Sequence, residues 1–113
     1  GGIELDPASL PMLAELVVAL KQSARAGYTV TVESHTDDSA PQSGLFKNNW
    51  ELSSIRAGRV ADYLVKQGFP PSMISATGYG DSRPKVPNLD AKGKPIPENR
   101  LLNQRVTIRV EEG

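Results

Sequence analysis

Residues 28–80 show a strand pattern, then a helix pattern, then a strand pattern, and this order constrains the fold more than any other feature of the chain. Residues 28–33 are rich in alternating β-branched and aromatic residues, which favours a strand. A helix is predicted from about Trp50 to Gln67, because small and apolar residues recur there at steps of three and four. The predicted buried stripe of this helix consists of Ser53, Ala57, Val60, Ala61 and Leu64. A short strand is predicted over residues 72–80.

Further patterns flank this unit on both sides. The preceding residues predict an amphipathic helix from about residue 7 to residue 26, which begins at Asp6-Pro7 or one turn later at Ser9. Its apolar positions are Leu10, Leu13, Val17, Leu20 and Ala24. Residues 105–110 alternate charged or polar with apolar side chains and predict a last strand with one face in water. Residues 2–5 add a candidate edge strand.

Together these elements predict an α/β (α+β) two-layer sandwich, in which two main helices pack on a mixed sheet of three to four strands. The sheet is expected to be mixed because no full helix precedes the last strand. Two loops interrupt the pattern. Residues 37–47 have turn chemistry, and residues 81–98 form a long excursion that is rich in proline. One helical turn is predicted over residues 99–103.

Composition limits the kinds of partner that this chain can have. Its 113 residues fit one domain over 1–113, and 13 basic residues balance 13 acidic ones. With no net charge and few aromatic side chains, the chain lacks the basic stacking surface that nucleic acid binding needs. Cysteine is absent, which removes disulfides, thiolate zinc sites and cysteine nucleophiles. No apolar run reaches the roughly 20 residues of a spanning helix, so a soluble piece is expected, although an anchor upstream of residue 1 would leave no trace.

The strongest candidate for a binding site is an acidic strand end that faces an arginine on the second helix. Asp37 and Asp38 follow the strand, and Arg56 falls at the border of the helix's buried stripe. A carboxylate only accepts hydrogen bonds, as an ammonium requires, while a guanidinium matches a carboxylate in a bidentate fork. We therefore expect Asp37 and Arg56 to bind a ligand that carries both charges, in a crevice at the carboxyl end of the strand.

Each of these residues also has a simpler interpretation. Asp37 and Asp38 would serve as turn residues whose side chains bond nearby backbone amides. Arg56 would be a surface ion-pair partner of Glu51 or Asp62, worth little to stability.

His35 invites a metal or catalytic interpretation that the sequence does not favour. It is the only histidine, so a zinc site would need carboxylates as all its other protein ligands. Ser34 and His35 are neighbours that point to opposite faces of a strand, which argues against a Ser-His-Asp relay. We expect no catalytic residue, no metal ligand and no cofactor. Trp50 is expected to be a hydrophobic plug beneath the loop rather than a platform on which a sugar stacks.

Several strings in the chain resemble the OmpA-like peptidoglycan-binding domain, and the resemblance covers nearly the whole sequence. The strings are Ser34-His35-Thr36-Asp37-Asp38, Asn49-Trp50-Glu51-Leu52-Ser53 with Arg56-Ala57, Ile74-Ser75-Ala76-Thr77-Gly78-Tyr79-Gly80, and Asn103-Gln104-Arg105-Val106. The Asn-Trp-Glu-Leu-Ser segment and the long loop before it look most like the MotB-type branch of flagellar stator proteins. The resemblance implies a binding module that is not an enzyme.

The ligand that this resemblance implies is meso-diaminopimelate in the stem peptide of peptidoglycan, bound noncovalently. By position, the resemblance assigns the ammonium of the ligand to Asp37 and its carboxylate to Arg56. Asn49 is the supporting contact, although its neighbour Asn48 leaves the alignment ambiguous. Further candidate contacts are Thr36, Leu52 and Gln104.

The resemblance also implies a setting for the domain. It would anchor a membrane protein or a motor stator to the cell wall, in the periplasm of a Gram-negative-type envelope, with peptidoglycan as its partner. The parent protein would be membrane-anchored, and a homodimer is a further expectation because MotB-type relatives are dimeric. The alternatives are a degenerate module for protein interaction or dimerisation and, less favoured, a cell-wall hydrolase.

Two departures from the family pattern bear on affinity. Family members usually carry Asn-Arg-Arg before the last strand, where this chain has Asn103-Gln104-Arg105. A neutral amide at Gln104 would then replace a cation near the ligand carboxylate and leave Arg56 without its usual cationic neighbour. The strand that normally precedes the first helix is reduced to residues 2–5.

Overall fold

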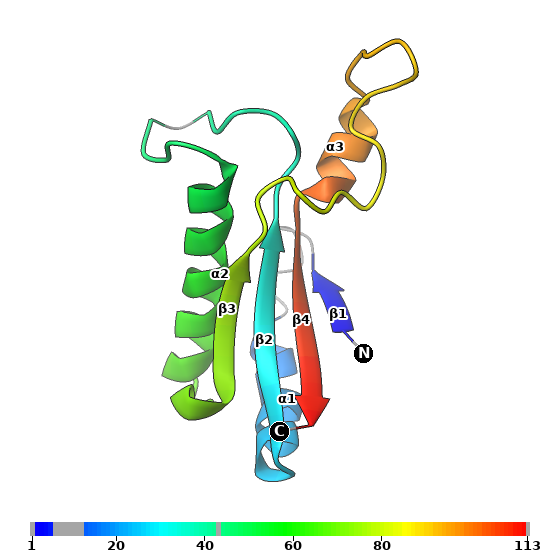
Figure 1. Ribbon diagram of the computed structural model, residues 1–113. Helices are drawn as coiled ribbons and strands as arrows, with labels where there is room; N and C mark the ends of the chain where they lie inside the picture. Colours follow the sequence, from blue (N-terminus) through cyan, green and yellow to red (C-terminus); the bar gives the residue numbers. More distant parts are fainter. Residues whose placement is uncertain (1, 6–12, 43, 113) are drawn as a thin grey trace.

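The computed structural model describes residues 2–5, 13–42 and 44–112 of the chain. Within these ranges strands alternate with helices (Figure 1). The elements are β1 (Gly2–Leu5), α1 (Leu13–Arg25), β2 (Tyr28–His35), α2 (Asn49–Lys66), β3 (Ile74–Gly78), α3 (Pro97–Asn103) and β4 (Arg105–Glu112). A short 3₁₀-helix, η2 (Pro71–Met73), leads into β3. The start predicted for the first helix, at Asp6-Pro7 or Ser9, lies outside the described residues, as does Leu10.

The strands form one mixed sheet in the order β1-β4-β2-β3. β2 and β3 run parallel, with Val30 opposite Ile74, and the crossover between them contains α2. β4 runs antiparallel to both of its neighbours, β2 and β1. The predicted two-layer sandwich with a mixed sheet is therefore confirmed, and residues 2–5 form its edge strand.

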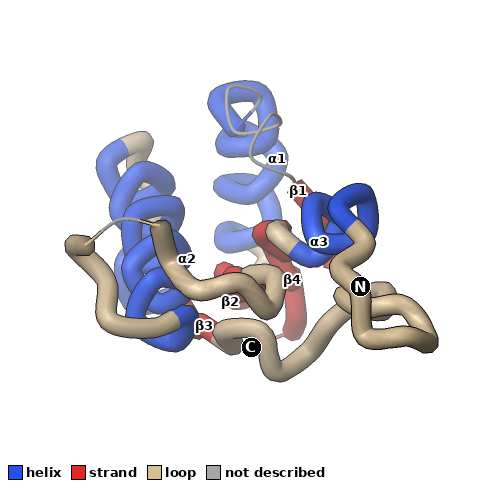
Figure 2. The backbone as a smooth tube through the Cα atoms, turned by 90° about the horizontal axis from the view of Figure 1, so that it is seen from above, coloured by secondary structure: helices blue, strands red, loops and turns tan. Residues whose placement is uncertain are grey.

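The core lies between the sheet and the two main helices, which cover the same face of the sheet (Figure 2). The buried apolar side chains are Val17, Leu20, Ala24, Val30, Val32, Ala57, Val60, Leu64, Phe69, Val106 and Ile108. Alternate residues of the central strands, such as Val30, Val32 and Ile108, point to the helices because side chains alternate between the faces of a strand. Burying one such aliphatic side chain contributes about 1.5–3 kcal/mol. The predicted helix stripes are confirmed for the side chains that the structure describes, except that Ala61 is only partly buried. The side chains of Leu10 and Leu13 lie outside that part.

The amino end of α2 lies very close to the end of β3, and two glycines allow this contact. A Cβ on Gly78 would lie 2.3 Å from the backbone nitrogen of Ser54. Gly80 has a φ of 59°, which favours glycine, and its N–H donates to Ser53 Oγ over 2.8 Å. The carbonyl oxygen of Gly80 in turn accepts from the N–H of Thr36 over 2.9 Å. The first turns of α2 are thereby tied to the segment that follows β2.

Three boundaries differ from the predictions for local reasons. The strand predicted over residues 72–80 begins only at Ile74, because Pro71 starts the 3₁₀-helix. β2 and β4 each extend two residues further than predicted, since they pair with each other along their whole length. α3 begins at Pro97, because proline is favoured in the first turn of a helix, where its missing N–H is not needed.

The prediction that Trp50 plugs the loop from below is wrong. Its side chain is 54% exposed, and its ring lies next to Gly80. Leu52 and Phe46 line the space beneath the loop instead. Among the described residues, no helix combines the length and the apolar character that crossing a membrane requires.

Candidate functional site

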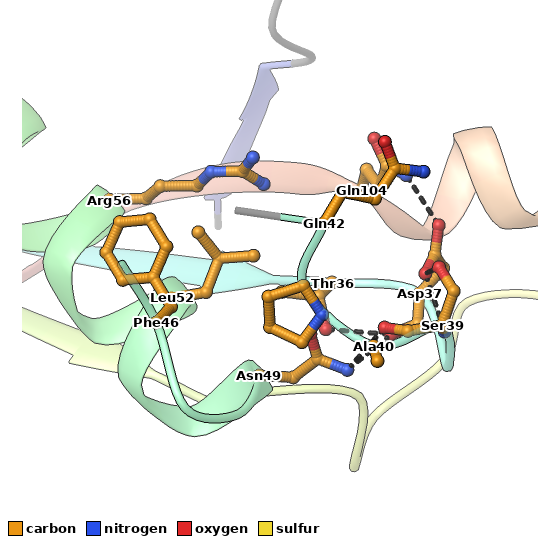
Figure 3. Close-up of a pocket in the computed structure, with 11 residues that line it drawn as sticks. Thr36, Asp37, Ser39, Ala40, Gln42, Phe46, Asn49, Leu52, Arg56 and Gln104 are labelled. Atoms are coloured by element: carbon orange, nitrogen blue, oxygen red, sulfur yellow. Dashed lines mark hydrogen bonds between the residues drawn. The ribbon is translucent and has the colours of Figure 1, made fainter. Parts of the chain in front are cut away.

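A cavity of about 340 Å³ opens between the loop after β2 and the first turns of α2 (Figure 3). Its volume lies in the range of small-ligand sites. It is lined by Thr36, Asp37, Ser39, Ala40, Pro41, Gln42, Phe46, Asn49, Leu52, Arg56 and Gln104. All six residues that the sequence suggested as ligand contacts belong to this lining, although they come from three separate parts of the chain.

Asp37 lies in the wall of this cavity and is only 5% exposed. Its Oδ1 accepts a 2.8 Å hydrogen bond from the N–H of Ser39 and a second bond from the Ser39 hydroxyl. Its Oδ2 accepts from Nε2 of Gln104. Burial alone would raise the pKa of Asp37, but these hydrogen bonds and the positive charge of Arg100 together outweigh it and hold the pKa below its usual value. Asp37 is therefore ionised at neutral pH.

The simpler interpretation of Asp37 as a turn residue is also confirmed, because its bonds to Ser39 close the turn after β2. The turn and a ligand contact are compatible. Oδ1 takes both bonds from Ser39, whereas Oδ2 takes only the one from Gln104. A carboxylate oxygen has two lone pairs, so Oδ2 keeps one acceptor position for a donor on a ligand.

Arg56 lines the cavity from α2 and forms no ion pair or hydrogen bond with any residue that the structure describes. The surface ion pair considered for it is therefore wrong: Asp62 pairs with Lys66 at 2.8 Å, and Glu51 does not pair with Arg56. The Arg56 side chain is exposed and extends along the cavity in Figure 3. Its guanidinium is thus available for a carboxylate from outside the chain.

The two neighbouring asparagines at the start of α2 have different roles. Asn48 is the N-cap, and its Oδ1 accepts from the N–H of Glu51 over 2.9 Å. Asn49 lines the cavity, and its Nδ2 donates to the backbone oxygens of Asp37 over 3.2 Å and Ser39 over 2.9 Å. Asn49 is therefore the asparagine that reaches the site, and it holds the loop that carries Asp37.

Apolar side chains form the wall of the cavity beside Arg56. Leu52 lies one turn before Arg56 on α2, and Phe46 lines the same cavity (Figure 3). Thr36 completes the wall near β2, where its Oγ1 donates to the carbonyl oxygen of Asp37 over 2.8 Å. An anion, a cation and apolar surface in one cavity suit a zwitterionic group on a hydrocarbon chain.

α3 supports the acidic part of the cavity from the other side. Nε of Arg100 lies 2.7 Å from Oδ1 of Asp38, and each side chain is 26% exposed. Gln104, one turn after Arg100, bonds Asp37. The amide of Gln104 is thus engaged with Asp37, because α3 ends beside the end of β2, and its place near the ligand carboxylate stays a prediction.

Asn103 ties the long excursion before α3 to the domain. Its side chain is fully buried, and its Oδ1 accepts from the N–H groups of Lys85 and Val86 at 2.9 and 3.1 Å. Its Nδ2 donates to the carbonyl oxygen of Val86 and to Oδ1 of Asn88 at 2.9 and 2.8 Å. One side chain therefore fixes residues 85–88, which gives the excursion a physical basis that the sequence did not reveal.

Sequence reasoning also missed Ser39 and Arg100. The Ser39 contact had a usable signal, because an aspartate two positions before a serine after a strand is typical of a side-chain turn. Arg100 had no local signal, since its partner Asp38 lies 62 positions away in the sequence.

His35 lines a second hollow, together with Glu33, Tyr79 and Arg83, and does not belong to the cavity of Asp37 and Arg56. Its ring stacks on Tyr79 with 5.2 Å between the centroids. The Tyr79 hydroxyl donates to Glu33 over 3.1 Å, and the Arg83 guanidinium lies 3.9 Å from the Tyr79 ring centroid. Within the part of the chain that the structure describes, no group of three or more His, Cys, Asp or Glu residues could hold a metal ion.

The fold and this site define the class of protein, and the chain belongs to the OmpA family, which matches residues 1–96. The resemblance in the sequence is thereby confirmed. The chain is 43% identical to outer membrane porin F of Pseudomonas fluorescens over 82 residues, which are 73% of this chain and 22% of the porin. It is 35% identical to the peptidoglycan-binding protein ArfA of Mycobacterium tuberculosis over 109 residues, which are 96% of this chain and 30% of ArfA.

Among solved structures, a MotB-like protein from Desulfovibrio vulgaris has the same fold, with a TM-score of 0.78 and 32% identity. The superposition covers 98% of this chain and 66% of that protein. This likeness agrees with the MotB-type branch that the sequence suggested. The chain spans less than a third of the length of the two curated relatives, at 22% and 30%.

Proposed function

We propose that this chain is a noncovalent peptidoglycan-binding domain that holds the free end of meso-diaminopimelate in the cavity beside β2. The observation that carries the proposal is the presence, in one cavity, of a buried carboxylate, Asp37, and a guanidinium, Arg56, that has no ion-pair partner among the described residues. ArfA, which aligns with 96% of this chain, is a peptidoglycan-binding protein, and this supports peptidoglycan as the ligand.

Each wall of the cavity has a role in this proposal. The ammonium of diaminopimelate would donate to the remaining lone pair of Asp37 Oδ2. The carboxylate of the ligand would accept two parallel hydrogen bonds from Arg56. Leu52 would pack on the hydrocarbon chain of the ligand, while Asn49 and Thr36 would keep the Asp37 segment in place. No bond of the ligand is made or broken.

Hydrolysis of the cell wall has less support from the site. A glycosidase needs two carboxyl groups that flank one bond. Asp38, the neighbour of Asp37, is instead paired with Arg100 on α3. The arrangement of charges therefore favours binding over catalysis.

We also propose that the domain links a longer envelope protein to the cell wall. The chain spans 66% of the MotB-like protein and 22% of the porin, so each of these relatives contains further segments. A membrane anchor, a periplasmic location and dimerisation are accordingly proposed for the parent protein. The likeness to MotB-like and outer-membrane relatives supports this setting.

Retention on purified sacculi tests the proposed binding. Asp37→Asn and Arg56→Gln each remove one charge, the first with little change in shape and the second with a shorter polar side chain. Each is expected to abolish sedimentation of the domain with sacculi, because leaving a charged group of the ligand unpaired costs about 2–5 kcal/mol. The amide spectrum of each variant would establish that the fold is kept.

Arg59→Gln is the matched control, because Arg59 is an exposed arginine of the same helix that does not line the cavity. This variant should sediment like the unchanged domain. Full retention of both Asp37→Asn and Arg56→Gln would contradict the proposal. Equal loss in Arg59→Gln would also contradict it, since it would indicate general charge attraction to the wall.

A further inference from the structure

Two unlike side chains, Asp37 and Gln104, meet in the cavity wall. Gln104 follows α3 directly, and its Nε2 donates to Oδ2 of Asp37 (Figure 3). The direction of this bond follows from the chemistry of the pair. An ionised carboxylate only accepts hydrogen bonds, so the amide must present its nitrogen to Asp37. The carbonyl oxygen of the amide is then not engaged with Asp37.

This carbonyl oxygen, Oε1 of Gln104, makes no hydrogen bond with the residues that the structure describes. Gln104 lines the cavity next to Asp37, so Oε1 offers an acceptor at the same place as the carboxylate. An ammonium has three donors, and Asp37 Oδ2 has one free lone pair for them. Oε1 can accept a second donor of the same ammonium.

The charges around this pair also suit an ammonium. Asp38 would be a competing carboxylate, but Arg100 pairs with it at 2.7 Å. Gln104 is neutral, whereas a cation at this position would repel an ammonium held by Asp37. The cavity wall therefore presents one carboxylate, from Asp37 after β2, and one neutral acceptor, from Gln104 after α3.

We infer that Gln104 is a specificity-determining residue that shifts recognition in this cavity toward the ammonium of the ligand. Its ligands would then include stem peptides with an ammonium-bearing side chain that lacks a neighbouring free carboxylate, as in lysine or an amidated diaminopimelate. The inference rests on the proposed function, because it concerns how much the ammonium and the carboxylate of the ligand each contribute to binding in the same cavity.

Three synthetic stem peptides that differ in one side chain separate the two charges. A diaminopimelate peptide carries the ammonium and the carboxylate, a lysine peptide carries only the ammonium, and a 2-aminopimelate peptide carries only the carboxylate. Titrations followed by amide chemical shifts would give the affinities and verify the fold together. For the unchanged domain, we expect the diaminopimelate peptide to bind most tightly and the lysine peptide to bind more tightly than the 2-aminopimelate peptide.

Gln104→Arg tests the inference, because arginine still donates to Asp37 but has no acceptor and adds a positive charge. We expect the ratio of lysine-peptide to 2-aminopimelate-peptide affinity to fall by about tenfold or more. If neither the neutral acceptor nor the absence of a cation at this position mattered to the ligand, the ratio would stay unchanged. That result would overturn the inference.

Gln104→Leu removes the donor and the acceptor without adding charge. It should weaken the diaminopimelate and lysine peptides and leave the 2-aminopimelate peptide unchanged, and equal weakening of all three would overturn the inference. Arg59→Gln should keep the ratio of the unchanged domain. Failure of the proposed function would look different, because the unchanged domain would then bind none of the three peptides.

Discussion

At the scale of the residue, the protonation of Asp37 is set by opposing effects. Burial in the cavity wall favours the neutral acid, while the bonds from Ser39 and Gln104 and the charge of Arg100 favour the carboxylate. The second group of effects is larger, so the pKa lies below the usual value of 3.8. The carboxylate is therefore present before any ligand arrives, with its turn already formed.

Binding of the ammonium should therefore persist at an acidity that would already protonate an ordinary aspartate. Because only the carboxylate attracts an ammonium, affinity should be lost as the pH falls through the lowered pKa of Asp37, below 3.8. The stability that the depressed pKa contributes to the fold is present above the pKa of the unfolded chain and disappears over the same acidic range. A titration of the Asp37 carboxyl carbon by NMR measures this pKa.

Ser39→Ala gives the matching comparison, because Ser39 supplies a hydrogen bond that lowers this pKa. The midpoint of the carboxyl titration should move to higher pH in this variant, and the loss of peptide affinity should move with it. A midpoint at or above 3.8 in the unchanged domain would contradict the account given for Asp37.

At the scale of the element, the position of α2 depends on its contact with the end of β3. Gly78 lets the backbone of Ser54 come close, and Gly80 bonds both Ser53 and Thr36. This contact fixes where α2 begins relative to β2, and hence where Arg56 lies relative to Asp37. A substitution at either glycine should therefore change the distance between Arg56 and Asp37 in the cavity.

Gly78→Ala should destabilise the domain by about 1–3 kcal/mol, because the added Cβ would lie 2.3 Å from a backbone nitrogen and one of the two elements must move. Gly58→Ala is the control within α2, where an added Cβ meets nothing within 4 Å. That substitution should stabilise the domain by about 0.5–1 kcal/mol, since alanine favours a helix. Urea unfolding measures both changes, and equal stability of the two variants would count against the close contact.

The elements were largely predictable because their signals are local. The helix expected from Trp50 to Gln67 is observed over Asn49–Lys66. Its buried stripe lies within the segment, and the glycine and prolines that end it follow directly in the sequence. The sequence also allowed Asp37 and Arg56 to be predicted as a pair, because each lies in a short motif. It did not allow the contacts around them to be predicted, because the contact between Asp38 and Arg100 joins distant segments whose meeting depends on the path of residues 81–98.

At the scale of the whole molecule, the last strand is central although it comes at the end of the described chain. β4 lies between β1 and β2 and contributes Val106 and Ile108 to the core. The family match ends at residue 96, before α3 and β4 begin. The matched segment by itself therefore lacks a strand that the sheet needs.

A chain that stops after residue 96 should not fold, because β1 would lose its partner strand and the core would lose two fully or nearly buried aliphatic side chains. Circular dichroism should show no cooperative thermal transition for this fragment. A chain that stops after residue 110 is the control, since it loses only the two exposed glutamates at the end of β4 and the glycine after them, and it should keep a cooperative transition. Cooperative folding of the shorter fragment would contradict the central role of β4.

The cavity takes its walls from the end of β2, from α2 and from the residue after α3, and these segments meet only when the chain is folded. Unfolding must therefore release any ligand that spans them, so the free energy of unfolding rises with ligand concentration. A ligand at 100 times its dissociation constant adds about 2.7 kcal/mol. A polymer that presents many copies of the ligand would in this way protect the domain that it holds, and melting temperature would report the occupancy of the site.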